Sequence, residues 1–232
     1  MGMNTEEDFY KSITRMLPLF EFLLHLIFPL GPGQRNSIPP ELASEILKLY
    51  PNDPSTHIGA SLGRNFVFGP PYGAQYRRAA TFYGDMAFIA GRRLTCQTWA
   101  GAGVPAFCYR FNAIPAGVMP IPAVTHFQEI GFVFYNTIGV GYPPVAINPF
   151  FNKSEAYKTL ARFMDSNWIS FIYDLDPNSW RSKWNGTEAL WPKYDVATPM
   201  DYVFDANVTS YAEHDTYRAE GMRLIGRYLT GE

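Results

Sequence analysis

A helix-forming segment followed by a glycine turn and a buried strand constrains this chain most. Residues 74–99 carry apolar side chains at three- to five-residue steps, the spacing of one helix face. Gly101 and Gly103 follow as stop signals, and residues 104–112 (VPAFCYRFN) are apolar and β-prone, which is typical of a strand covered on both faces. Helix, tight turn and buried strand form half of an α/β unit. The sequence therefore predicts an α/β fold.

Helical spacing of apolar residues predicts four further helices, over residues 5–15, 41–50, 154–173 and 214–229. Thr5 and Asp8 are placed as a capping pair for the first of them. Residues 52–72, and a stretch that carries Trp180, Trp184 and Trp191, are turn-rich and are predicted loops. The coarse expectation is one α/β body with many aromatic-rich loops.

Composition limits the classes of partner. The 19 Lys and Arg against 21 Asp and Glu give a net charge of −2, which leaves no basic footprint for nucleic acid. Charged residues are 17% of the chain, below the usual figure of about 25%. Such a chain is poor in surface residues, so we expect part of it to pack against protein outside the chain. The apolar residues 16–30 are interrupted by Pro18, Glu21, His25 and Pro29, so the stretch is too short and too broken for a typical membrane span. We expect a buried or partner-facing segment, with an uncleaved membrane anchor as the alternative.

Three N-x-S/T sequons lie in polar, turn-rich stretches, at Asn152, Asn185 and Asn207. They favour a secreted glycoprotein, although residues 1–10 are acidic and do not resemble a signal peptide. Cys96 and Cys108 are 12 positions apart, a spacing compatible with either a disulfide or two buried thiols. We expect no cofactor and no metal site, because the histidines and cysteines form no cluster with ligand spacing.

His126 is the strongest catalytic candidate. It follows the predicted strand on a loop held by Pro115, Pro120 and Pro122, and Glu129 comes three residues later. Enzymes of the α/β class place general bases at the carboxyl ends of strands, where a loop exposes the ring. Spacing alone leaves the alternative of a structural loop histidine open.

Other candidate groups have simpler explanations. Ser61 is the centre of a literal G-x-S-x-G, but no strand precedes it and no helix follows, as a nucleophile elbow requires. Asp85 and Asp215 stand in predicted helices near arginines, so ion pairing explains them better than catalysis.

Seven segments, in order along the chain, together resemble the type B carboxylesterase/lipase family, the cholinesterase-like α/β-hydrolases, in its fungal form. They are residues 77–94 (RRAATFYGDMAFIAGRRL), 109–112 (YRFN), 126–134 (HFQEIGFVF), 168–171 (WISF), 176–178 (DPN), 191–194 (WPKY) and 215–221 (DTYRAEG).

The resemblance implies a catalytic role for His126 as the base that activates a serine and then protonates the leaving alcohol. It also implies that Glu129 is the glutamate that follows that histidine. Residues 2–9 are similar to the segment directly after the family's acid, so the acid, the nucleophile and the oxyanion-hole glycines are expected upstream. Phe127 departs from the glycine or serine that commonly follows the histidine in this family.

The leading hypothesis is that residues 1–232 are the C-terminal portion of a secreted carboxylesterase or lipase, an incomplete α/β-hydrolase sheet with packed helices. Its substrate in the complete enzyme is a small-molecule or lipid ester, and the chain alone is expected to be inactive. An alternative is a non-catalytic esterase-like interaction module or gene remnant. A third hypothesis, a self-contained hydrolase that uses Ser61, His126 and Asp85, leaves too few residues between serine and histidine for the fold.

Overall fold

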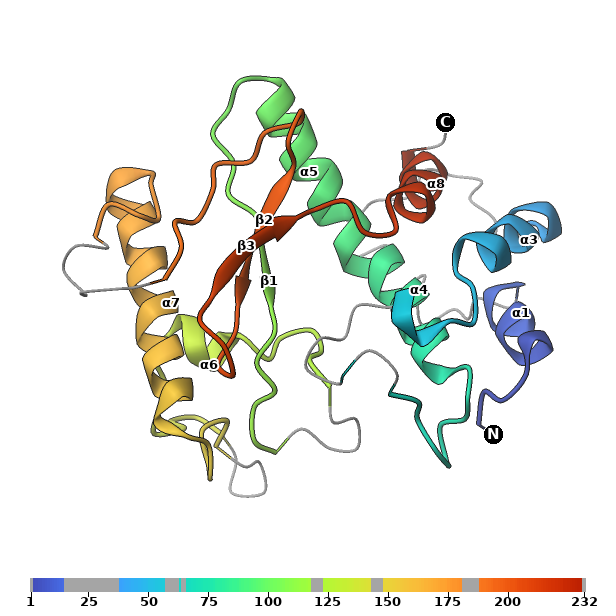
Figure 1. Cartoon of the computed structure of the whole chain (residues 1–232), viewed down its shortest axis with the longest axis horizontal. Coiled ribbons are helices and arrows are strands. Elements are labelled where there is room, and N and C mark those ends of the chain that lie inside the picture. The colour runs from blue at the N-terminus through green and yellow to red at the C-terminus, as the bar shows by residue number, and fades with distance from the viewer. Residues whose placement is uncertain are drawn as a thin grey trace. The chain divides into compact units, whose positions relative to one another are not determined.

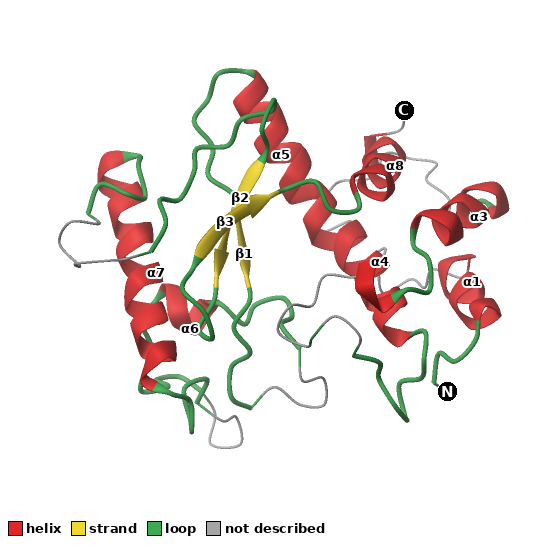
Figure 2. Ribbon diagram, in the orientation of Figure 1, coloured by secondary structure: helices red, strands yellow, loops and turns green. Residues whose placement is uncertain are grey.

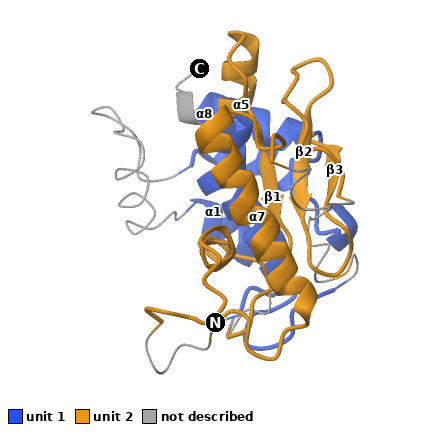
Figure 3. Ribbon diagram, turned by 90° about the vertical axis from the view of Figure 1, so that its left-hand side faces the viewer, with its two compact units in different colours: residues 1–58, 64–94, 216–232 blue, residues 59–63, 95–215 orange. Residues whose placement is uncertain are grey.

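A computed structural model describes residues 2–14, 38–56, 63, 66–117, 123–142, 148–180 and 188–230 (Figure 1). Within those residues, helices accompany a small sheet of three strands (Figure 2). The chain divides into two compact units (Figure 3). The first, called here the helical unit, comprises residues 1–58, 64–94 and 216–232, and the second, the sheet unit, comprises residues 59–63 and 95–215.

The helical unit contains α1 (Glu6–Thr14), α3 (Pro40–Leu49), the short η1 (Pro54–Thr56), α4 (Tyr76–Gly84), η3 (Asp85–Ile89), the first part of α5 (Ala90–Gly101) and α8 (Ala219–Thr230). Its core is apolar and includes Phe9, Ile46, Phe82 and Ile225, from α1, α3, α4 and α8, each at most 3% exposed; η3 and α5 also contribute to it. The predicted capping pair is confirmed, because the Asp8 amide donates to Thr5 Oγ1 (3.1 Å) and the Thr5 amide donates to Asp8 Oδ2 (2.8 Å).

The strongest predicted helix, residues 74–99, is confirmed as a helical run from Tyr76 to Gly101 that includes a π-helical turn, η3. Gly103 has a φ of +76°, a left-handed conformation in which glycine ends the run. The helix predicted over residues 41–50 is α3, with Pro40 in its first turn, where the missing amide hydrogen of proline has no helical partner to lose.

The sheet unit is built on β1 (Tyr109–Phe111), β2 (Met200–Phe204) and β3 (Tyr211–His214), with α6 (Ile130–Val133) and α7 (Glu155–Asp174). The strand order is β1-β2-β3; β1 runs parallel to β2, and β2 runs antiparallel to β3. Leu160, Ala161 and Met164 of α7 share one buried cluster with Tyr202 and Phe204 of β2. Helices packed on this mixed sheet confirm the predicted α/β class.

Aromatic rings fill the interior of the sheet unit. Trp191 stacks on Tyr202 with ring centroids 5.8 Å apart and an interplanar angle of 21°. Trp191 also meets Phe204 edge-on at 5.2 Å and Trp168 of α7 at 5.5 Å. Offset-stacked and edge-on pairs of this kind add stability beyond the area that they bury. Much of the high aromatic content of the sequence is therefore core.

Two sequence expectations about strands and one about a helix need correction. The predicted strand 104–112 is hydrogen-bonded as β1 only over Tyr109–Phe111, although the carbonyl of Cys108 still accepts the amide of Tyr202 at 2.9 Å. Strands β2 and β3 were not predicted, and the helix expected over residues 214–229 begins only at Ala219. Such short strands lack a long periodic pattern, and their pairing depends on partners elsewhere in the chain.

Candidate active site

His126 lies in an exposed turn, residues 126–129, that follows β1 in the sheet unit. The next residue, Phe127, has a φ of +75° and is 68% exposed. The two rings lie with centroids 5.9 Å apart. A positive φ is unusual for a bulky residue, and strain of this kind is found at functional turns. The loop thus presents the His126 ring at the surface, as expected from the sequence. Of the three prolines predicted to hold this loop, Pro120 and Pro122 lie outside the described residues.

Both ends of this turn are anchored. On the N-terminal side, Val124 packs against the core of the sheet unit, and the Thr125 amide donates to Gln128 Oε1 at 2.9 Å. On the C-terminal side, the carbonyl of Glu129 accepts the amide of Phe132 at 2.8 Å and so begins α6.

The anchor residue of α6 is Phe132, which is fully buried. Its ring lies 4.9 Å from that of Phe111 at the end of β1 and 4.6 Å from that of Phe150. The turn that carries His126 is therefore fixed to the carboxyl end of a core strand, which is the place where open α/β sheets build their sites.

The charge of Glu129 affects the ionisation of a tyrosine on β1, the strand that precedes His126. Burial, and then the nearby charge of Glu129, raise the pKa of Tyr109 on β1 to about 12. Both effects disfavour the tyrosinate, since burial removes water and a like charge lies close. Tyr109 is therefore a buried phenol that stays protonated near Glu129.

A buried polar pair at the same end of the sheet was missed from sequence. Asn112 and Asp205 directly follow β1 and β2, and Asn112 Nδ2 donates to Asp205 Oδ2 at 2.6 Å. The backbone amide of Asn112 also donates to the carbonyl of Phe204 at 2.8 Å. Polar residues at the ends of two parallel strands are the signal in the sequence, but β2 has only 5 residues and no long periodic pattern that marks it as a strand. The pair ties the end of β1, from which the His126 loop departs, to the end of β2.

The remaining candidates fall in different places. Asp85 is bound by Arg218 in the helical unit, which confirms the predicted ion pair, while Asp215 accepts the Tyr194 hydroxyl at 3.0 Å in the sheet unit. His214 is exposed at the end of β3. The G-x-S-x-G serine, Ser61, lies outside the described residues.

Within the described ranges, no group of three His, Cys, Asp or Glu side chains is arranged to hold a metal ion. A search of the same ranges found no helix both long and apolar enough to cross a membrane.

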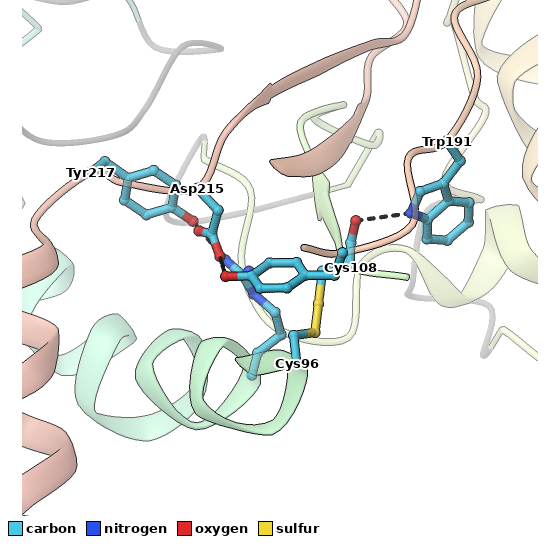
Figure 4. The surroundings of a disulfide bond; sticks show 7 residues. Cys96, Cys108, Trp191, Asp215 and Tyr217 are labelled. Carbon is cyan, nitrogen blue, oxygen red and sulfur yellow. Dashed lines mark hydrogen bonds between the residues drawn. A yellow bond between two sulfur atoms is a disulfide. The ribbon is translucent and has the colours of Figure 1, made fainter. Parts of the chain in front are cut away.

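A disulfide joins Cys96 of α5 to Cys108, directly before β1, with Cα atoms 6.7 Å apart (Figure 4). The carbonyl of Cys108 accepts the indole N–H of Trp191 at 2.9 Å. This pairing resolves the two possibilities that the 12-residue spacing left open. The cross-link fixes the residue that leads into β1.

The sequence matches the family model described as the carboxylesterase family over residues 71–221. The chain belongs to the carboxylesterase family. This match spans the seven segments that carried the resemblance, and it includes His126 and Glu129. No curated protein matches the chain.

Among solved structures, the chain is similar to a carboxylesterase of Geobacillus stearothermophilus, EST55, crystallised at pH 6.2, with 19% identity and a TM-score of 0.53 over 93% of this chain. A second structure of EST55, at pH 6.8, matches with 22% identity and a TM-score of 0.45 over 87% of the chain. The chain spans 36% of the length of either one. The first likeness confirms the expected fold, part of an α/β-hydrolase with an incomplete sheet.

Proposed function

We propose that this chain is the C-terminal portion of a secreted carboxylic ester hydrolase that acts through a serine acyl-enzyme, and that His126 is its general base. The observation that carries the proposal is the His126 turn itself. An exposed imidazole stands on a loop anchored by Val124 and Phe132 beside the end of β1. Membership of the carboxylesterase family supplies the reaction class.

In this mechanism the imidazole of His126 takes the proton of a serine hydroxyl as the oxygen attacks the ester carbonyl. The imidazolium then gives that proton to the leaving alcohol, and the same ring activates water to release the acid. An anchored turn suits this role, because a base must stay within hydrogen-bond reach of two successive oxygen atoms.

The serine, the acid and the oxyanion donors are supplied by sequence upstream of the segments that carry the family resemblance. The 232-residue chain alone is therefore inactive toward esters, since a lone imidazole lacks both a nucleophile and stabilisation of the oxyanion. A serine-directed fluorophosphonate probe tests this statement. We expect no covalent label on the folded chain; a label on Ser61 would show a self-contained hydrolase instead.

The role of His126 is tested on the complete protein. The full native transcript is sequenced first, and we expect it to continue in frame through a strand-flanked G-x-S-x-G and an acid motif. In the encoded protein, His126→Ala lowers kcat by as much as about a million-fold, as removal of a triad histidine does. The matched control is His214→Gln, at an exposed strand end, which leaves kcat unchanged. Retention of full activity by His126→Ala would overturn the assignment.

The alternative, a non-catalytic interaction module, is favoured by one observation. The segment after the His126 turn exposes large apolar side chains, with Phe134 73%, Ile138 80% and Val140 70% exposed. An apolar surface of this kind associates with other protein. A transcript that encodes only these 232 residues, together with capture of a stoichiometric partner by wild type but not by Ile138→Asp, would favour this alternative over catalysis.

A further inference from the structure

The sequon at Asn152 lies in an exposed turn of the sheet unit. It occupies the turn between the buried Phe150 and α7, and both Asn152 and Ser154 are exposed. Asn152 has a φ of +53°, a left-handed conformation that is tolerated in turns, and asparagine adopts it more readily than most residues. N-linked glycans require such exposed turns because the attached sugar is bulky and hydrophilic.

The turn holds its own backbone together without using the sequon side chains. The Phe151 amide donates to the carbonyl of Asn148 at 2.9 Å, and the Lys153 amide donates to that of Phe150 at 3.1 Å. Asn148 Oδ1 accepts the Phe150 amide at 2.9 Å. The local fold of the turn is therefore compatible with a substituent on Asn152.

Ser154 is the N-cap residue of α7, yet its hydroxyl makes no capping hydrogen bond. A serine at this position ordinarily uses its oxygen to accept an amide of the first helical turn. Between the two sequon residues, Lys153 folds back, with its Nζ 4.9 Å from the centre of the Tyr157 ring. The asparagine amide and the serine hydroxyl both remain accessible beside it.

The exposed sequon at Asn207, between β2 and β3, differs in its contacts. Its backbone amide donates to Asp205 Oδ1 at 2.7 Å. A hydrogen bond from its side chain also lowers the pKa of the Tyr157 phenol, against the larger opposing effects of burial and of Asp205. The side-chain amide of Asn207 is thus hydrogen-bonded to Tyr157, close to the buried Asn112–Asp205 pair. No such hydrogen bond involves the side chain of Asn152 in the described part of the chain.

We propose that Asn152 carries an N-linked oligosaccharide in the native protein; this inference rests on the proposed secreted location but not on catalysis. Nδ2 of Asn152 forms a bond to the anomeric carbon of the first sugar and loses one proton. The bond between that carbon and the lipid diphosphate of the donor breaks, and the lipid diphosphate leaves with the electron pair. A glycan at Asn152 requires that the N-terminal end of α7 faces solvent in the complete carboxylesterase. The remainder of that enzyme must therefore pack against other surfaces of this chain.

The test uses the full chain, directed into the secretory pathway of a yeast host by an added leader. Peptide N-glycosidase treatment in heavy-oxygen water, followed by peptide mass spectrometry, is expected to find a labelled aspartate in place of Asn152. On gels, Asn152→Gln and Ser154→Ala each remove one glycan. Ser154→Thr keeps that glycan, because threonine also completes the sequon.

Two results would overturn the proposal: an unmodified Asn152 peptide from the secretory-pathway product, or an unchanged glycan number in Asn152→Gln. The variant Asn207→Gln serves as the matched control and leaves the peptide modification at Asn152 intact. None of these readouts requires ester hydrolysis, so the proposal fails or holds independently of the catalytic assignment of His126.

Discussion

Arg218 holds the buried carboxylate of Asp85 with two hydrogen bonds of 2.6 Å each, from Nε to Oδ2 and from Nη2 to Oδ1. The Tyr50 hydroxyl donates to the same carboxylate at 2.9 Å. The side chains of Arg218 and Asp85 are 6% and 0% exposed. Burial, followed by the charge of Asp85, raises the pKa of Tyr50. This cluster joins the end of α3, the π-helical turn and the residue before α8.

Removal of one partner from that buried pair is expected to be costly. Arg218→Met leaves the Asp85 charge buried with only the Tyr50 hydroxyl, and we expect a loss of about 3 to 5 kcal/mol in unfolding free energy. The half-buried pair of Arg110 and Glu213, 2.8 Å apart, is the comparison. Arg110→Met is expected to lose less, because the Glu213 side chain is 25% exposed and water can reach it once its partner is gone. Urea unfolding measures both; equal losses would contradict this account.

Alanine substitutions at two glycines of α8 are expected to change stability in opposite directions. A Cβ atom built on Gly221 lies 2.7 Å from Cε2 of Tyr50, whereas one built on Gly226 meets nothing within 4 Å. Gly221→Ala is expected to destabilise the protein by about 1 to 3 kcal/mol, since it overpacks a core that includes a fully buried tyrosine. Gly226→Ala is expected to stabilise it by about 0.5 to 1 kcal/mol through helix propensity. Thermal melts of both variants check this; a stabilised Gly221→Ala variant would show that Tyr50 moves freely.

The capping pair of α1 predicts a pH dependence. Hydrogen bonds from the Thr5 amide, the Thr5 hydroxyl and the Asn4 amide lower the pKa of Asp8 below its ordinary value of 3.8. A carboxyl with a depressed folded-state pKa contributes stability above its unfolded pKa and loses it as the pH falls through the folded one. The contribution is therefore complete above about pH 4 to 5 and declines below that range.

Unfolding curves between neutral and strongly acidic pH are expected to show this loss in wild type and a smaller one in Asp8→Asn. Glu7→Gln is the matched control, because Glu7 shares the first turn of α1 but pairs with Lys11 rather than with the backbone. An Asp8→Asn variant with the same acid dependence as wild type would contradict the capping assignment.

The disulfide provides a further prediction with its own optical reporter. Replacement of both Cys96 and Cys108 by alanine opens a closed loop of 12 positions, for which we expect a loss of about 3 kcal/mol in stability. Because the carbonyl of Cys108 accepts the Trp191 indole, the tryptophan fluorescence of the double variant is expected to shift as well. Thiol titration of the unfolded, unreduced wild type should find no free thiol from this pair; two reactive thiols would show that it is unpaired.

The periodic parts of the fold were accessible from sequence. The helices over residues 154–173 and 74–99 and the Thr5–Asp8 cap depend on neighbours within a few positions, so the local pattern contains the information that specifies them. The position of His126 after a core strand was equally local, because the apolar residues of β1 precede it and those of α6 follow it. Its catalytic role remains a prediction of the family resemblance.

What the sequence by itself determined is therefore the longer helices, apart from the start of α8, together with the α/β class and the histidine loop, each specified by short-range periodicity and turn chemistry. Only the tertiary structure decided that Arg218 pairs with Asp85 across 133 positions, that Asn112 meets Asp205 across 93, and that Cys96 bonds to Cys108. It also decided the strands β2 and β3, whose few residues become a sheet only beside β1. The physical reason is that these contacts gain their energy from burial and pairing with distant residues, which no local pattern records.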